Sequence, residues 1–201
     1  MSPLSRWLWL LTALLVLAWW QHAPGPRARE PGVLVADAPL QQPLDTAPLP
    51  LEKPGVAIKL LATFSLSARV LGRADYRWDF GAALIPVDLA LGWGRMSDTA
   101  VLDQMDISQG ARFYRWQVKQ FPIPEREIIE SSANMHLIPA TDAVERGIKR
   151  TRVGDVVTFD GYLVEADWPD GTKWVSSLTR SDSGAGACEL VWVEHFDIAP
   201  R

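Results

Sequence analysis

Cys188, His136 and Asn134 are the residues of this chain whose types could together perform covalent chemistry. A thiol, a histidine that acts as its base and an asparagine that orients the histidine form the catalytic set of a cysteine hydrolase. The sequence around Cys188 matches no nucleophile signature, however, and such signatures do not transfer between families. Because a free cysteine is also a common small buried residue, we favour a non-catalytic protein and keep a hydrolase that uses Cys188 with His136 as the alternative.

His136 ends a polar cluster that begins at Ser131 and lies beside an apolar run. A histidine can titrate near neutrality, which suits a general base, but a hydrogen-bonded core histidine explains the residue equally well. Arg180, Asp182 and Glu189 flank the last loop, where ion pairs would hold that loop in place. The polar cluster and the residues that flank the last loop could together line a polar pocket. The candidate ligand-binding residues are Ser132, Asn134, His136, Arg180 and Asp182.

No motif of the sequence has the spacing of a metal or cofactor site. The glycine-rich stretch 184–186 lacks the lysine and the hydroxyl residue of a phosphate loop, so a tight turn explains it better. The single cysteine excludes an intrachain disulfide and a thiolate zinc cluster. Four aspartates are not spaced as a calcium loop, and helix caps or surface charges account for most of them: Asp88, Asp98, Asp103 and Asp106. We therefore expect neither a metal ion nor a cofactor.

The charge of the chain limits its partners. The formal net charge is −4 at pH 7 and the N-terminal part is nearly balanced, so the domain is mildly acidic. An acidic surface argues against duplex nucleic acid or anionic lipid as a main partner. Residues 112–116 interleave basic and aromatic side chains, as single-strand platforms do, but an ordinary strand shows the same interleaving. We expect no nucleic-acid partner, and these side chains, if exposed, would suit a protein or a glycan.

Alternation of apolar and polar residues predicts the strands that must position these side chains. Residues 56–70 alternate over their whole length and predict a long half-buried strand. Residues 153–167 carry apolar groups on both faces, which suits a central or barrel strand. The turn Pro169-Asp170-Gly171-Thr172 joins this strand to the next as a hairpin. Further strands are predicted over 111–118, 173–180 and 189–197.

Helices are fewer. Ser97 is expected to cap a helix over 98–105, Pro124 opens a helix over 124–131, and Thr141 opens a helix that ends at Lys149-Arg150. The pattern predicts an α+β fold, an antiparallel twisted sheet or small β-barrel with helical insertions, preceded by one transmembrane helix. The last strands would also suit an oligonucleotide-binding-type barrel, although a fold does not by itself give a function.

Residues 7–20, WLWLLTALLVLAWW, form the only long apolar run and follow Arg6. As a helix this run would be roughly 21 Å long, which suits a signal peptide as well as a membrane span. The bulky tryptophans that end the run disfavour cleavage after Ala18, and they stand where an aromatic belt would lie. The sequence favours an uncleaved anchor within residues 1–22 over a cleaved signal or a buried helix, with the bulk of the chain outside the cytoplasm.

A proline-rich segment, residues 23–55, follows the apolar run. Proline removes backbone donors and fixes φ, so this segment is expected to be a semi-extended linker. A docking segment for a partner is the alternative. The remaining residues, 56–201, number about 145, the usual size of one domain.

Several strings of the sequence resemble a family of uncharacterised bacterial proteins that carry a short N-terminal membrane segment. The strings are DYRW (75–78), PVDLALGWG (86–94), MSD (96–98), SSANMHLIPA (131–140) and GAGACE (184–189), and the resemblance covers most of residues 57–197. It implies a bacterial protein attached to a membrane, and it implies neither an activity nor a functional residue. We therefore expect a single-pass protein of the bacterial inner membrane, anchored by residues 7–20, whose periplasmic domain binds or scaffolds another envelope protein. A small-ligand binding module is a further alternative.

Overall fold

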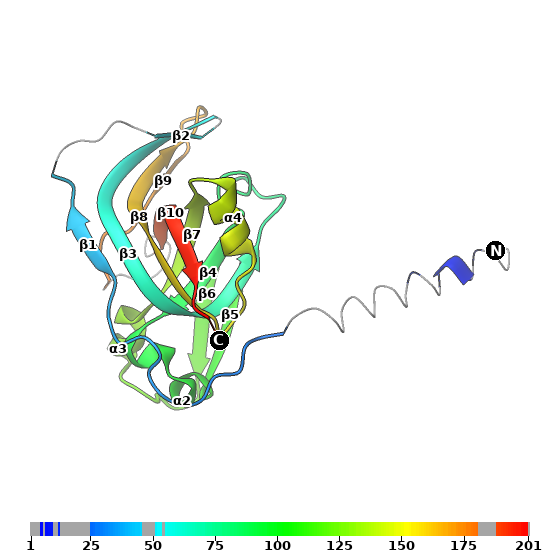
Figure 1. Ribbon diagram of the computed structural model, residues 1–201, viewed down its shortest axis with the longest axis vertical. Helices are drawn as coiled ribbons and strands as arrows, with labels where there is room; N and C mark the ends of the chain where they lie inside the picture. The colour runs from blue at the N-terminus through cyan, green and yellow to red at the C-terminus, as the bar shows by residue number, and fades with distance from the viewer. Residues whose placement is uncertain are drawn as a thin grey trace.

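Strands pair around a closed ring in the computed structural model, which describes residues 5, 7–9, 12, 25–45, 51–53, 55–180 and 188–200. The ring runs through β3 (Val56–Asp75), β4 (Val87–Gly92), β7 (Ser132–Pro139), β10 (Glu189–Ile198) and β8 (Val156–Asp167), and β8 closes it by pairing with β3 (Figure 1). Neighbouring strands are antiparallel except β7 and β10, which are parallel. This order, with helix α4 between β7 and β8, is the topology of an oligonucleotide-binding-type barrel.

β3 is the longest described strand and the one that bends the sheet into a ring. Its first two thirds pair with β8 and its last third pairs with β4. The register shifts between Leu60 and Ala62 and again between Val70 and Gly72, and such bulges increase bend and twist. The alternation over 56–70 correctly predicted this strand, which continues for five further residues to Asp75.

The inward-facing residues of all five ring strands make one hydrophobic core. Phe64 of β3 and Phe159 of β8 are the largest of its fully buried side chains, and both are 2 % exposed or less. At Gly161 the backbones of β8 and β10 approach so closely that a Cβ would overlap the carbonyl oxygen of Trp192. The barrel interior is therefore filled with side chains. Other core members are Leu66, Leu89, Leu91, Met135, Leu137, Leu163, Val191 and Val193.

Shorter elements cover the outside of the barrel. β1 (Leu40–Pro43) and β2 (Leu51–Lys53) pair with β3, and β9 (Lys173–Val175) pairs with β8. The hairpin of β5 (Met105–Gly110) and β6 (Phe113–Val118) forms a second sheet. The helices are η1 (Gly94–Ser97), α2 (Thr99–Leu102), α3 (Glu125–Glu130) and α4 (Asp142–Lys149). The β-rich α+β class is thus confirmed.

Several element predictions need correction. The helix expected over 98–105 is only the four-residue α2, and Asp98 caps it by accepting the N–H of Ala100. Ser97, the expected cap, is instead buried in contacts with residues 34 and 35. Strands β1, β2, β4, β5 and β7 were not predicted. β4 and β7 are buried on both faces, so their sequences show no alternation of apolar and polar residues.

The described part of the proline-rich segment lies against the domain. Residues 27–35, which we call the strap, bind it at both ends: Arg27 N–H donates to the Val153 carbonyl at 2.7 Å. Leu34 and Val35 donate their N–H groups to Ser97 Oγ at 3.1 Å each. Beyond the strap, β1 and β2 add to the barrel sheet, so the folded unit includes residues well before position 56.

Most of the apolar run lies outside the described residues. Its described members, residues 7–9 and 12, are helical, and Thr12 Oγ1 donates to the Leu8 carbonyl oxygen at 2.8 Å. Trp7, Leu8 and Trp9 are more than 60 % exposed, so the described domain does not cover them. Within the part of the chain that the structure describes, no helix is both long and apolar enough to cross a membrane.

Candidate functional site

The predicted polar cluster lies on the outer face of β4 and β7. Asp88 of β4 and His136 of β7 are register partners. Their neighbours Leu89 and Leu137 point into the barrel core, so these two side chains point outward. The β5–β6 hairpin covers the same face, because Ala90 packs in one cluster with residues of that hairpin. The cluster is therefore enclosed between the barrel wall and the hairpin.

Arg112, at the tip of the hairpin, is the centre of this cluster. The two turn residues Ala111 and Arg112 have φ of 50° and 65°, a left-handed conformation that costs about 1–3 kcal/mol for residues other than glycine. The Arg112 N–H compensates by donating to Tyr76 Oη at 2.9 Å, and the guanidinium lies 3.6 Å from the centre of the Tyr76 ring. Asp79 receives two further hydrogen bonds from the guanidinium, at 2.7 and 2.8 Å.

The same guanidinium neutralises a fully buried carboxylate. Arg112 Nη1 donates to Asp88 Oδ1 at 2.8 Å and to the Ile85 carbonyl at 3.0 Å. Asp88 is 0 % exposed, so its charge depends on this partner. Burial alone would lower the pKa of Arg112, but the hydrogen bonds and charges of Asp79 and Asp88 outweigh it and raise that pKa. Arg112 is therefore a permanent cation in the site.

His136 lies beside the ion pair of Asp88 and Arg112. Its Nδ1 lies 2.9 Å from Asp88 Oδ1, within ion-pair distance but not aligned as a hydrogen bond. The Trp174 ring packs on the imidazole with 4.4 Å between ring centres. Because His136 is 1 % exposed, a substrate in solution has no direct access to it.

Asn134 connects the cluster to Cys188. Asn134 Nδ2 donates to the Arg112 carbonyl at 3.0 Å and lies 3.7 Å from Cys188 Sγ, while Gln109 Nε2 donates to Asn134 Oδ1 at 2.6 Å. Asn134 therefore contacts the half-buried thiol, whereas in a hydrolase set it would orient His136, and the hydrogen bonds of its amide hold the hairpin instead.

Ser132 contributes to the packing of α3 and of the hairpin. Its hydroxyl donates to the Ile128 carbonyl at 2.7 Å and accepts from Tyr114 Oη at 3.4 Å. Burial raises the pKa of Tyr114 to about 12, and the hydrogen bond to Ser132 opposes that rise only in part. Both residues thus belong to the layer between the barrel and the hairpin.

Arg180 and Glu189 lie on the other face of the barrel wall. Glu189 shares its face of β10 with Val191, a core residue, and it pairs with Arg180. The Arg180 guanidinium also lies 5.6 Å from the centre of the core Phe64 ring. The pocket predicted from all the polar candidates is thus divided: Arg180 is separated by the sheet from Asn134 and His136. Asp182, the remaining candidate, lies outside the described residues.

The other candidate motifs have structural roles. Asp98 caps α2, and Asp88 pairs with Arg112. Along β6, Phe113 and Arg115 are exposed whereas Tyr114 and Trp116 pack on the hairpin side of the sheet, so the alternation is that of an ordinary two-faced strand. Among the described residues, no three His, Cys, Asp or Glu side chains gather as a metal site would require.

The ion pair between Asp88 and Arg112 was not predicted from the sequence. A usable signal was present, because Asp88 lies within the otherwise apolar string Val87–Leu91. A carboxylate in a strand that is buried on both faces needs a cationic partner. The identity of that partner depends on a hairpin tip 24 residues away, which the sequence pattern does not specify.

Comparisons with known proteins add no further constraint: no family model, no curated protein and no solved structure matches this chain.

Proposed function

We propose that this protein is a single-pass protein of the bacterial inner membrane whose barrel faces the periplasm and binds or scaffolds another envelope protein. The supporting observation is the position of the strap. The apolar run ends at Trp20, and Arg27 already bonds to Val153 of the domain. A helix formed by residues 7–20 would therefore hold the barrel directly against the membrane surface.

The chemistry of the polar cluster favours binding over catalysis. Arg112 pairs with the buried Asp88, and His136 packs beside this pair, so the ion pair secures the hairpin to the barrel. Barrels of this topology use the outer face of their second and third strands, here β4 and β7, to bind oligonucleotides and oligosaccharides. The β5–β6 hairpin occupies that face in this chain, which supports a protein partner over nucleic acid.

A partner would have to use another surface, and exposed aromatic side chains on the loop between β3 and β4 offer one. Trp78 is 95 % exposed and Phe80 58 % exposed, and the Phe80 ring packs on Trp168 with 5.0 Å between centres. Aromatic residues are enriched at protein interfaces. The ion pair of Asp79 with Arg112 holds this loop in place, so the loop presents a preformed surface.

The anchor is tested by membrane extraction and by reporter fusion of the full chain. The wild-type protein should stay in the membrane pellet after alkaline carbonate treatment, and a C-terminal reporter should be active only outside the cytoplasm. Leu14→Arg with Leu15→Arg should release or mislocalise it, because each arginine at the centre of a span costs about 2.5–3.5 kcal/mol. Leu178→Arg, on the exposed domain surface, is the matched control and should leave the location unchanged. An extractable wild type or an active cytoplasmic reporter would contradict the proposal.

The hydrolase alternative needs Asn134 to orient His136, but Asn134 Nδ2 lies 3.7 Å from Cys188 Sγ instead. A nucleophilic thiol should react with iodoacetamide in the folded protein, faster than a thiol in an unfolded peptide. Absence of reaction before denaturant is added would exclude Cys188 as the nucleophile.

A further inference from the structure

A cleft of about 1030 Å³ lies where the strap begins, away from the polar cluster. Gly25 and Pro26 line one side, the end of α4 and the segment that follows it line a second, and the C-terminal residues after Phe196 line a third. Figure 1 shows the C-terminus beside the start of the blue segment. Three parts of the chain that are far apart in sequence therefore enclose this cleft.

Basic side chains dominate its lining. The carboxylates that oppose them are Asp75 and Asp197. The C-terminal end of α4 attracts cations by its own dipole, which accounts for Lys149 and Arg150. The other basic residues come from β3, the strap and the loop after α4, so the helix dipole does not explain them. The basic residues are Arg27, Arg73, Lys149, Arg150 and Arg152.

Some of these cations are already neutralised. Arg27 pairs with Asp155, Arg73 with Asp75 at 2.6 Å, and Lys149 with Glu145. Arg150 and Arg152 differ, because among the described residues neither guanidinium forms an ion pair or a hydrogen bond. The cleft therefore has two guanidinium groups available to an external anion. Guanidinium groups suit phosphate because their parallel N–H donors match two phosphate oxygens.

The lining of the cleft also has an apolar part, and the proposed anchor limits the distance between the cleft and the membrane. Phe196 and Ile198 pack on the barrel core and also line the cleft, so a ligand would contact hydrocarbon as well as charge. Gly25 lies five positions after Trp20, the last residue of the apolar run. A chain of this length spans at most about 18 Å. If residues 7–20 lie in a membrane, the cleft is therefore within reach of its headgroups.

We propose that this basic cleft binds a phosphate group, and that at the membrane the group belongs to an anionic phospholipid headgroup. The membrane source rests on the proposed anchor, whereas phosphate binding rests on the cleft alone. The mild acidity of the whole domain does not oppose this, because the local field is set by the side chains that line the site. The bound headgroup would fix which face of the barrel is turned to the bilayer.

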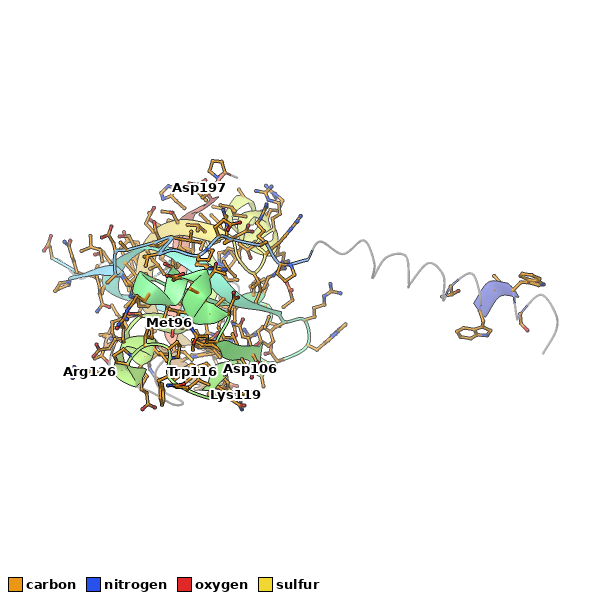
Figure 2. All side chains as sticks on the ribbon, turned by 90° about the horizontal axis from the view of Figure 1, so that it is seen from below. Met96, Asp106, Trp116, Lys119, Arg126 and Asp197 are labelled. Atoms are coloured by element: carbon orange, nitrogen blue, oxygen red, sulfur yellow. The ribbon has the colours of Figure 1, made fainter. Side chains whose placement is uncertain are left out.

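The test measures hydrogen–deuterium exchange of residues 147–153 and 196–200 in the full-length protein. One arm titrates inorganic phosphate against the protein in neutral detergent at constant ionic strength. The other compares nanodiscs of phosphatidylcholine with nanodiscs that contain phosphatidylglycerol. The variant carries Arg150→Gln and Arg152→Gln. Its control carries Lys119→Gln and Arg126→Gln, which lie on the side of the domain opposite to Asp197 (Figure 2).

We expect both phosphate and phosphatidylglycerol to slow exchange, with a roughly tenfold weaker apparent affinity in the Arg150/Arg152 variant and no change in the control. Protection by phosphate alone would overturn the lipid source and leave a site for a soluble phosphate compound. Protection in neither arm, or equal protection in both variants, would overturn the site. If the protein fails to insert into phosphatidylcholine discs, the proposed membrane anchor is refuted. The phosphate titration in detergent would then still show whether the cleft binds phosphate.

Discussion

Replacement of Arg112 by glutamine tests whether the polar cluster holds the hairpin on the barrel. The Arg112 side chain is 13 % exposed and its partner Asp88 0 % exposed, so the substitution leaves an unpaired carboxylate in the interior. Breaking a buried pair in this way costs about 3–5 kcal/mol. The second partner, Asp79, is 37 % exposed and adds little. For a domain of this size each kcal/mol lowers Tm by about 2–4 °C, so we expect a loss of roughly 10 °C.

The assay is urea unfolding followed by tryptophan fluorescence, with a second variant that removes the stranded charge. Arg112→Gln with Asp88→Asn should be more stable than Arg112→Gln alone, because the buried carboxylate is then absent. Arg115→Gln, on an exposed position of the same strand, should change the free energy of unfolding by less than about 0.5 kcal/mol. An Arg112→Gln cost below about 1 kcal/mol, or strictly additive effects of the two substitutions, would refute the role of Arg112 as the neutralising partner.

Other predictions follow from single contacts. The hydrogen bond to Asp160, at 2.9 Å, raises the pKa of His195. The NMR titration midpoint of His195 should therefore lie above 6.5, and it should return towards 6.5 in Asp160→Asn. The stability that this interaction contributes is present below pH 6.5 and is lost as the pH rises through the raised pKa. Burial raises the pKa of Tyr114 to about 12, so stability should fall between pH 10 and 12, and Tyr114→Phe should remove that alkaline loss in thermal melts. Ser97→Ala leaves two strap N–H groups without their acceptor and should cost about 1–3 kcal/mol, with faster amide exchange at Val35 as the direct measurement.

The sequence predicted those elements whose two faces differ. β3 and α4 have one apolar and one polar face, and both were found close to their observed bounds. β4 and β7 are covered by the barrel core on one side and by the hairpin on the other. A strand buried on both sides loses the alternation that would reveal it, so the two strands that carry the candidate site were among those missed.

Residue types alone did not predict which of the candidate site residues lie close together. Asn134 and His136 share a face because they are two residues apart on one strand, and that relation was readable once β7 was known. The separation of Arg180 from them depends on which face of β10 carries Glu189, a register that the chain fixes only by folding. The role of Arg112 depends on a turn formed by Ala111 and Arg112, which lacks the glycine or asparagine that usually marks such a turn.

The closure of the barrel by β3 and β8 has a consequence for how the protein is made. The register pairs Ala57 with Asp167 and Arg69 with Val156, so the ring cannot close until most of the chain has been synthesised. Contacts between residues so distant in sequence fold slowly. During that delay residues 57–69 of β3 lack β8, the partner that closes the ring, and an unpaired strand edge is prone to aggregation. A binding chaperone or continuous export of the nascent chain would shorten this exposure.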